Sequence, residues 1–268
     1  METAKYLEKL HRTEMEIVDE IDRICVANNL RYFLVGGTLL GAVRHGGFIP
    51  WDDDMDVAMP RPDYEKFLTL CETQLGSDFF CQSYRNDEVY VPPFAKVKKN
   101  GTKFIEAIDN GIQYGKHPGI WVDIFPLDYA KKQNGTQKMQ RKLIVKLRNM
   151  KSFKLNRRKS KWYKKFVASF FSHRFLSSMR QKVMTRCKKG DFYVNLGSRY
   201  DVIKQTMPIS VYEPAVRLKF EDREYMAPAD YKYVLNRIYG DDYMSLPPEE
   251  KRVTHEPVEI SFGDEGEN

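Results

Sequence analysis

The sequence predicts an α+β fold in which a mixed β-sheet is flanked by helices and carries an additional basic helical region. Three observations predict it. Apolar residues recur at helical spacing over 4–28, short β-type runs alternate with helical stretches up to about residue 130, and 131–189 reads as helices. Because 42% of the 268 residues are hydrophobic, the chain can bury a core, which excludes a wholly disordered protein.

The first elements follow from local signals. Leu7, Leu10, Ile17, Ile21 and Ile24 form an apolar stripe with one seven-residue gap, which predicts a helix over 4–28. The β-type run 32–35 is ended by two glycines, and a second helix follows. In order, the predicted elements are a strand (32–35), a helix that Thr38 caps and that ends near Gly46, a strand (54–59) and a helix from Pro62 to about Leu75.

The later elements have weaker signals. The run 121–125 reads as a clear strand, closed by Pro126 because proline cannot donate to a ladder. Asp230 is expected to cap a helix that Gly240 stops. The remaining predicted elements are strands at 79–83, 93–98 and 103–106, helices within 131–189, and a hairpin over 217–226 with its turn at Glu221-Asp222.

Positive charge is concentrated in one segment. Residues 131–189 hold 21 Lys or Arg and no Asp or Glu, whereas the rest of the chain holds 23 basic and 37 acidic residues. Trp162, Phe166 and Phe170 recur there at a spacing of four. A basic amphipathic helix of this kind can lie on an anionic membrane. Alternatively, the aromatic residues pack as core. Nucleic-acid binding is not expected, since no binding motif accompanies the charge.

The remaining composition bears on location. No run of about 18 apolar residues suggests a membrane span, and the N-terminus lacks the apolar core of a secretory signal. The four cysteines are scattered without metal-like spacing, as expected of reduced thiols. We therefore expect a cytoplasmic protein, with peripheral contact between 131–189 and the inner face of the plasma membrane as one option.

The densest chemical signal is a glycine pair followed by paired aspartates. In a strand, Asp54 and Asp56 point to one face, and two such carboxylates repel unless a cation lies between them. Mg²⁺ suits two carboxylates together with phosphate oxygens, and Mn²⁺ is the alternative. Gly36 and Gly37 let backbone approach a phosphate closely, and the following helix start favours an anion. A solvated acidic turn is the alternative reading, but the combination of features favours a site.

A third carboxylate is expected from Asp123, which interrupts the apolar run 121–125 and needs a partner if it is buried. Lys96 and Lys98 alternate on one predicted strand face and could neutralise a diphosphate. Exposed strand lysines are equally ordinary. Arg44 and His45 end the helix after the glycine pair, where they either bind phosphate or simply complement a helix C-terminus.

Three stretches resemble the LicD family of phosphocholine transferases and its relatives, which include fukutin-type ribitol-phosphate transferases. They are 34–57 (LVGGTLLGAVRHGGFIPWDDDMDV), 121–128 (WVDIFPLD) and 239–252 (YGDDYM with LPPEEKR) together with His255. The resemblance implies a nucleotidyltransferase-like fold. It also implies that Asp54, Asp56 and Asp123 are the catalytic metal ligands, and that Gly36, Gly37 and Thr38 hold the donor phosphate. Arg44, His45, Lys96, Lys98 and His255 are further donor-binding candidates, and Asp52 is a ligand or supports one.

The expected reaction is Mg²⁺-dependent transfer of an alcohol phosphate, phosphocholine first, from a CDP-activated donor such as CDP-choline. The acceptor is a hydroxyl of a cell-surface glycan or teichoic-acid precursor, and CMP leaves. Two alternatives stay open: a nucleotidyltransferase that releases pyrophosphate, and a non-catalytic module that binds membrane or anionic polymer. We expect a catalytic core (1–130), a basic helical region (131–190), a C-terminal part (191–261) completing the catalytic domain, and a mobile tail (262–268).

Overall fold

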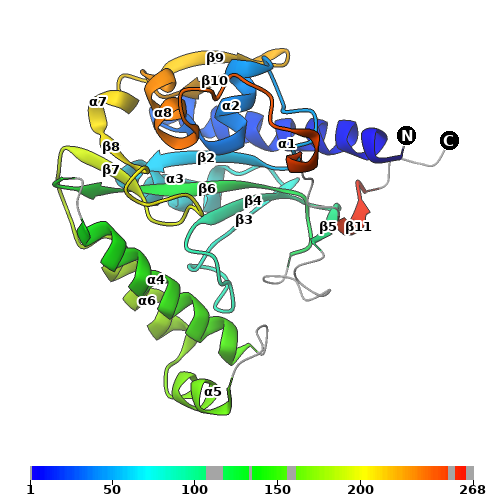
Figure 1. Ribbon diagram of the computed structural model, residues 1–268. Helices are drawn as coiled ribbons and strands as arrows, with labels where there is room; N and C mark the ends of the chain where they lie inside the picture. Colours follow the sequence, from blue (N-terminus) through cyan, green and yellow to red (C-terminus); the bar gives the residue numbers. More distant parts are fainter. Residues whose placement is uncertain (1, 107–116, 133–134, 156–160, 253–256, 264–268) are drawn as a thin grey trace.

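The computed structural model describes residues 2–106, 117–132, 135–155, 161–252 and 257–263 (Figure 1). Among these residues the central sheet has seven strands, in the order β1-β2-β6-β4-β3, with β7 beside β6 and β8 beside β7. The strands are β1 (Phe33–Leu34), β2 (Met55–Pro60), β3 (Phe79–Gln82), β4 (Ala95–Lys99), β6 (Trp121–Ala130), β7 (Phe192–Asn195) and β8 (Thr206–Pro208). Strands β2 and β6 are parallel and the other pairs antiparallel, which confirms the predicted mixed sheet.

Helices cover the sheet and a separate helical arm leaves it (Figure 1). The long α1 contacts β4, β6 and α3, and α2 contacts β2, α8 and the hairpin. The helices near the sheet are α1 (Glu2–Ala27), α2 (Gly36–Arg44), α3 (Arg61–Gln74), α7 (Ile209–Tyr212) and α8 (Tyr231–Tyr239); the arm consists of α4 (Gly135–Lys154), α5 (Trp162–Ser169) and α6 (His173–Met184). A 3₁₀ turn, η2, spans Glu249–Lys251. No described helix is long and apolar enough to cross a bilayer.

Two small two-stranded sheets complete the fold. β9 (Val216–Phe220) and β10 (Arg223–Ala227) form the predicted hairpin with Glu221 and Asp222 at its turn. β5 (Lys103–Glu106) pairs with β11 (Pro257–Ser261). The C-terminal segment therefore adds β7 and β8 to the main sheet and β11 to the strand β5. Of the expected tail, only Phe262 and Gly263 lie within the described residues.

Two sequence predictions were wrong in detail. Thr38 does not cap α2, which begins at Gly36 after Val35; its Oγ1 instead accepts a hydrogen bond from the Asp56 N–H at 2.8 Å. Strand β6 does not stop at Pro126 but continues to Ala130. The reason lies in its neighbours: β4 pairs with 121–124 and β7 with 127–130, so proline falls where the partner on that side changes.

The far end of β6 is fixed by a buried ion pair. Arg61, at the start of α3, donates from Nε to Asp128 Oδ1 at 2.7 Å and from a terminal nitrogen to Oδ2 at 2.9 Å. Asp128 and Asp123 are five residues apart, so they point to opposite faces of β6. Both residues belong to the same sequence motif. Asp128 joins α3 to one face of the sheet, while Asp123 points to the opposite face.

The arm is attached by two of its own cations. The Lys151 ammonium is fully buried and donates to the Tyr90 carbonyl at 2.7 Å and to Ser177 Oγ at 2.8 Å. The buried Arg180 guanidinium donates to the carbonyls of Val91 and Pro92. Buried charges require such partners. The predicted helices within 131–189 are confirmed for the described residues, but the core interpretation of the stripe of Trp162, Phe166 and Phe170 is wrong, because these side chains are exposed.

Candidate active site

A row of charged side chains crosses three adjacent strands at one level. Asp56 on β2 is the register partner of Asp123 on β6, and Asp123 is the register partner of Lys96 on β4. Register partners on neighbouring strands point to the same face and lie about 5 Å apart. Lys96 Nζ donates to Asp123 Oδ1 at 2.5 Å. The structure thus brings Asp123 next to Asp56, although 66 residues separate them in the chain.

Asp54 lies in the segment that enters β2, and its charge raises the pKa of Asp56. With Asp52 and Asp53 it forms a group whose carboxylate oxygens lie within 4.8 Å of one another. Among the described residues, these three carboxylates are close enough together to share one metal ion without moving. It overlaps the predicted set of Asp54, Asp56 and Asp123 at Asp54 alone. The acidic site therefore has two halves, one before the strand and one on the sheet.

The start of α2 closes over these carboxylates. Gly36 has a φ of +59°, and a Cβ there would lie 3.2 Å from Asp56 Oδ2. A Cβ on Gly37 would lie 2.5 Å from Asp52 Oδ2, so no side chain fits without moving that carboxylate. The first helical hydrogen bond runs from Leu39 N–H to the Val35 carbonyl. The N–H groups of Gly36, Gly37 and Thr38 precede it at a helix start, where an anion is favoured.

Burial and like charges act together on the acidic groups. Desolvation raises the pKa of Asp56 well above its ordinary value, and the charges of Asp54, Asp123 and Asp52 raise it further. The pKa of Asp123 is also raised by desolvation, while Lys96 acts in the opposite direction. Such a site keeps a proton or holds a cation.

Glu14 is an acidic residue that the sequence reasoning missed. It is buried on α1, and its Oε2 has no hydrogen-bond partner among the described residues. Desolvation and the charges of Asp54, Asp52, Asp53 and Asp56 raise its pKa well above the ordinary value. A signal was present: position 14 fills the seven-residue gap in the apolar stripe between Leu10 and Ile17.

The two predicted lysines have different surroundings. Lys96 pairs with Asp123 and lies over the Trp121 ring at 4.1 Å. Lys98 is buried, donates to the His117 carbonyl at 2.6 Å and lies 5.4 Å from the same ring. Lys96 is therefore in the acidic row, whereas Lys98 ties β4 to the segment before β6, and its charge also lowers the pKa of Asp123.

Arg44 and His45 lie at the other end of α2. Arg44 donates to the carbonyls of Tyr243 at 3.2 Å and Ser245 at 3.1 Å, and from Nε to His45 Nε2 at 3.0 Å. The His45 ring meets the Trp51 ring edge-on at 6.3 Å. These contacts hold the 243–245 segment against α2. His255 lies outside the described residues, so its predicted role stays a prediction.

Two tyrosines and an arginine border the carboxylates without having been predicted as site residues. The hydroxyls of Tyr200 and Tyr239 are 2.6 Å apart. Desolvation raises the pKa of both phenols, and the charges of Asp52 and Asp56 raise it further. The Arg199 charge acts on Asp123 and lowers its pKa. Tyr239 opens the third family-like stretch, but the loop holding Arg199 and Tyr200 carries no motif.

The tryptophans beside the acidic motifs already have cations over their rings. Arg252 lies 4.9 Å from the Trp51 ring, and Lys96 lies 4.1 Å from the Trp121 ring. A choline cage needs open aromatic faces. The pairing of these rings with protein cations therefore favours packing over choline recognition at both positions.

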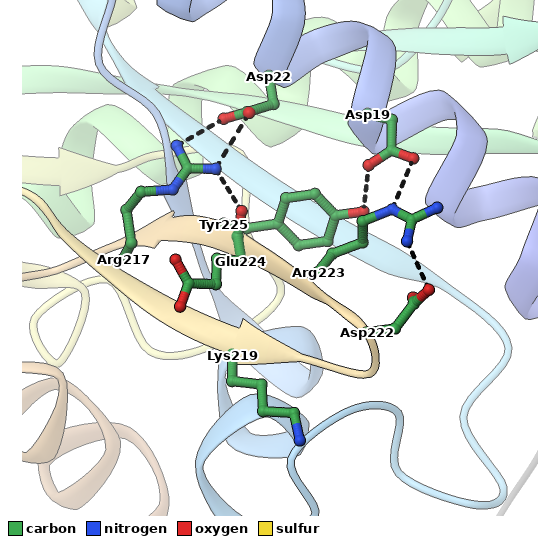
Figure 2. A pocket seen from close by; sticks show the side chains of 8 residues that line it. All are labelled: Asp19, Asp22, Arg217, Lys219, Asp222, Arg223, Glu224 and Tyr225. Carbon is green, nitrogen blue, oxygen red and sulfur yellow. Dashed lines mark hydrogen bonds and ion pairs between the residues drawn. The ribbon is translucent and has the colours of Figure 1, made fainter.

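A charged hollow between α1 and the β9–β10 hairpin is a different feature (Figure 2). Figure 2 shows that its arginines point at carboxylates: Arg217 binds Asp22 with two contacts of 3.1 Å, and Arg223 binds Asp19 at 3.3 Å and Asp222 at 2.5 Å. Because these charges neutralise one another, the hollow reads as an ion-pair network that fastens the hairpin to α1. We assign it no ligand.

Comparison with known proteins bears on the acidic site. The family model described as LicD/FKTN/FKRP, nucleotidyltransferase domain, matches residues 29–154, which include the glycine pair and all three predicted aspartate ligands. Residues 29–154 thus match the LicD-type nucleotidyltransferase domain. The match begins just after α1 and ends with α4, so it covers β1, β2, β3, β4 and β6 of the sheet.

Three named transferases are similar to this chain. The lipopolysaccharide cholinephosphotransferase LicD of Haemophilus influenzae is 29% identical over 253 residues, 90% of this chain and 92% of that protein. The ribitol 5-phosphate transferase FKRP of Mus musculus is 30% identical over 103 residues, 37% of this chain and 17% of that protein. Human FKRP is 45% identical over 51 residues, 19% of this chain and 10% of that protein. The likeness to the bacterial relative thus extends far beyond the matched domain.

Proposed function

We propose that this chain is a phosphotransferase that moves a substituted phosphate, phosphocholine in the first instance, from a CDP-linked donor to a hydroxyl of a glycan. CMP is the other product, and a lipopolysaccharide or teichoic-acid precursor is the acceptor class. The full-length likeness to a lipopolysaccharide cholinephosphotransferase supports the phosphocholine donor. The four free cysteines are consistent with a reducing cytoplasmic compartment as the place of reaction.

One observation carries the proposal: the carboxylates of Asp56 and Asp123 are register partners on parallel strands directly beside the start of α2. A diphosphate at that helix start would meet the N–H groups of Gly36 and Gly37 on one side and carboxylates on the other. Anion and carboxylates repel, so the two can share the space only with a cation between them. This is the arrangement that a metal-bound diphosphate requires.

The donor set fits a hard divalent cation such as Mg²⁺. Asp54, Asp56 and Asp123 are the proposed ligands, and Asp52 and Asp53 lie close to Asp54. The Glu14 carboxyl, whose Oε2 has no hydrogen-bond partner within the described ranges, is near enough for the charges of Asp54 and Asp56 to raise its pKa. When bound, the ion would neutralise the diphosphate and stabilise the charge that develops in an in-line displacement. Zinc is not proposed, because the cysteines are scattered through the sequence and lack metal-like spacing.

The chain's own groups would then orient the donor. Backbone N–H groups at the start of α2 would hold phosphate oxygens, while Lys96 and Arg199 would add positive charge beside Asp123. The Tyr200–Tyr239 pair borders the carboxylates and would present hydroxyls to the donor or acceptor. Asp123 would take the proton of the acceptor hydroxyl once substrate binding breaks its ion pair with Lys96.

Donor binding tests the proposal. CDP-choline, CDP-ribitol, CDP-glycerol and CTP, each with Mg²⁺, would be compared by their effect on the melting temperature of the full chain. A ligand at one hundred times its Kd stabilises the native state by about 2.7 kcal/mol. We expect CDP-choline to give the largest shift. A shift with CTP alone would contradict the proposal.

The products of turnover separate the proposed reaction from its main alternative. Transfer of an alcohol phosphate releases CMP from the donor, whereas a nucleotidyltransferase releases pyrophosphate from CTP. We expect CMP and no pyrophosphate. Pyrophosphate formation would assign the acidic site to nucleotide transfer instead.

A further inference from the structure

Helix α5 leaves almost its whole surface in solvent. Every residue from Trp162 to Ser169 except Ala168 is exposed, and the apolar ones are exposed strongly. The exposed fractions are 78% for Trp162, 57% for Phe166 and 71% for Phe170, which follows the helix. Tyr163 and Val167 are also exposed. Folding alone does not explain why this many large apolar side chains gather on so short a helix.

These five residues, Trp162, Tyr163, Phe166, Val167 and Phe170, form what we call the aromatic tip. Figure 1 shows α5 at the end of the arm that is farthest from the sheet. The rings of Phe166 and Phe170 meet edge-on at 5.0 Å, and those of Trp162 and Tyr163 at 6.3 Å. The exposed rings of the tip therefore meet in pairs on one short segment and are not scattered over the surface.

Positive charge surrounds the tip. Lys161, Lys164 and Lys165 are exposed on the same turns. The arm sequence 131–189 contains no acidic residue with which they could pair locally. Farther along the arm, Arg174 reaches Glu88 outside it at 2.5 Å, with both side chains largely exposed. The surface of the tip thus combines aromatic rings with net positive charge.

We propose that the aromatic tip docks the protein on an anionic lipid bilayer. Tryptophan, tyrosine and phenylalanine side chains suit the boundary between headgroups and acyl chains, where an apolar body and a polar edge are both satisfied. The three lysines lie where their long stems can follow the apolar surface and carry the ammonium groups to lipid phosphates. This inference concerns where the chain works and does not depend on the reaction proposed above.

The shape of the tip favours a bilayer over a protein partner. An eight-residue helix is about 12 Å long, and a stable protein interface buries about 800 Å² on each side. A convex protrusion of this size offers too little area for such an interface, whereas insertion into lipid needs only a few rings. A second copy of the chain would bring the same positive charge to the contact and would be repelled.

Vesicle binding by the full chain tests this docking. Vesicles of phosphatidylcholine are compared with vesicles that also contain phosphatidylglycerol. We expect sedimentation with the anionic vesicles only, and weaker binding as salt is raised. Trp162 fluorescence should shift to shorter wavelength on binding, and Trp162→Phe should still bind but lose the shift, because Trp51 and Trp121 lie elsewhere. Equal binding to both vesicle types, or a shift that persists in Trp162→Phe, would overturn the proposal.

Two variants assign the contact to the tip. The triple variant Trp162→Ser, Phe166→Ser and Phe170→Ser should lose binding at least about tenfold with an unchanged melting temperature, since these side chains are exposed. Lys161→Gln, Lys164→Gln and Lys165→Gln together should weaken binding on the order of a hundredfold, at roughly fivefold per charge. The charge-matched control is Lys66→Gln, Lys219→Gln and Lys232→Gln, which should bind nearly as wild type.

Three further outcomes would overturn the inference. Undiminished binding by the triple serine variant would place the contact elsewhere. Equal losses of vesicle binding in the two sets of lysine variants would show that only the net charge of the protein matters. Failure of the wild-type chain to bind anionic vesicles, with a change in oligomeric state in the serine variant, would make the tip a protein interface.

Discussion

Asp56 and Asp123 lie side by side as register partners on the parallel strands β2 and β6. The parallel pairing matters because it places the two carboxylates at the same level and on the same face of the sheet. Lys96 continues the row on β4 and binds Asp123. A buried acidic pair with only one adjacent lysine in its row is an unfavourable arrangement for stability alone. It is understandable as a site that binds a cation.

Substitution of Asp56 on β2 and of Asp128 on β6 should separate an effect on activity from an effect on stability. We expect Asp56→Asn to lower transferase turnover by a factor on the order of 10³, the scale seen when charge stabilisation is removed. Its metal-free melting temperature should rise, because burial and like charges disfavour the ionised carboxylate. Activity assays and thermal unfolding in a chelator measure the two effects.

Asp128→Asn is the matched comparison. It breaks the bidentate contact with the buried Arg61 and should destabilise the fold by about 3 kcal/mol. Loss of stability in Asp56→Asn, with no effect of Asp128→Asn, would reverse the assigned roles.

The glycine pair should be sensitive to a single methyl group. In Gly37→Ala the new Cβ would lie 2.5 Å from Asp52 Oδ2, so the carboxylate must move. We expect turnover to fall by about tenfold or more, because a displacement of about 1 Å at a reacting site is costly. Gly135→Ala is the control, since a Cβ there meets nothing within 4 Å. Equal activity of the two variants would show that the close approach at Gly37 has no role.

Glu14 makes a prediction about pH. Its pKa is raised, so the native state keeps a proton that the unfolded chain loses above its ordinary pKa of 4.5. The protonated Glu14 carboxyl therefore contributes its full stability below about pH 4.5. This contribution is lost as pH rises through the higher pKa of Glu14 in the native state. One such proton changes the unfolding free energy by up to about 1.4 kcal/mol per pH unit.

The melting temperature of the metal-free wild type should fall as pH rises from 5 to 8. In Glu14→Gln this fall should be smaller by a few degrees. The exposed Glu8→Gln provides the control on the same helix. Parallel pH profiles for wild type and Glu14→Gln would disprove the assignment of a buried protonated carboxyl.

Much of the fold was predictable because each local signal agreed with its surroundings. The helix at 62–75 and the strand at 54–59 each fall within one residue of α3 and β2. Asp123 was predicted because a charged residue in an apolar strand needs a partner. The end of β6 was not predictable, since the break at Pro126 disappears only when β4 and β7 share that edge of the strand.

The rest of the site depends on contacts between distant segments. Tyr200 and Arg199 come to the carboxylates through a loop whose sequence has no motif, so only tertiary structure reveals them. Helix α5 illustrates the opposite case. Its aromatic spacing was visible, but the same spacing serves a core helix and a surface helix, and only exposure decides between them.

Metal binding by aspartate variants is the most direct test of the central claim. Mn²⁺ binding to the full chain would be followed by calorimetry, with Asp123→Asn compared with Asp53→Asn. If the ion sits between Asp54, Asp56 and Asp123, then Asp123→Asn should weaken binding by about tenfold or more, while Asp53→Asn has the smaller effect. Unchanged affinity in Asp123→Asn, with loss in Asp53→Asn, would contradict the account and move the ion to the compact group of Asp52, Asp53 and Asp54.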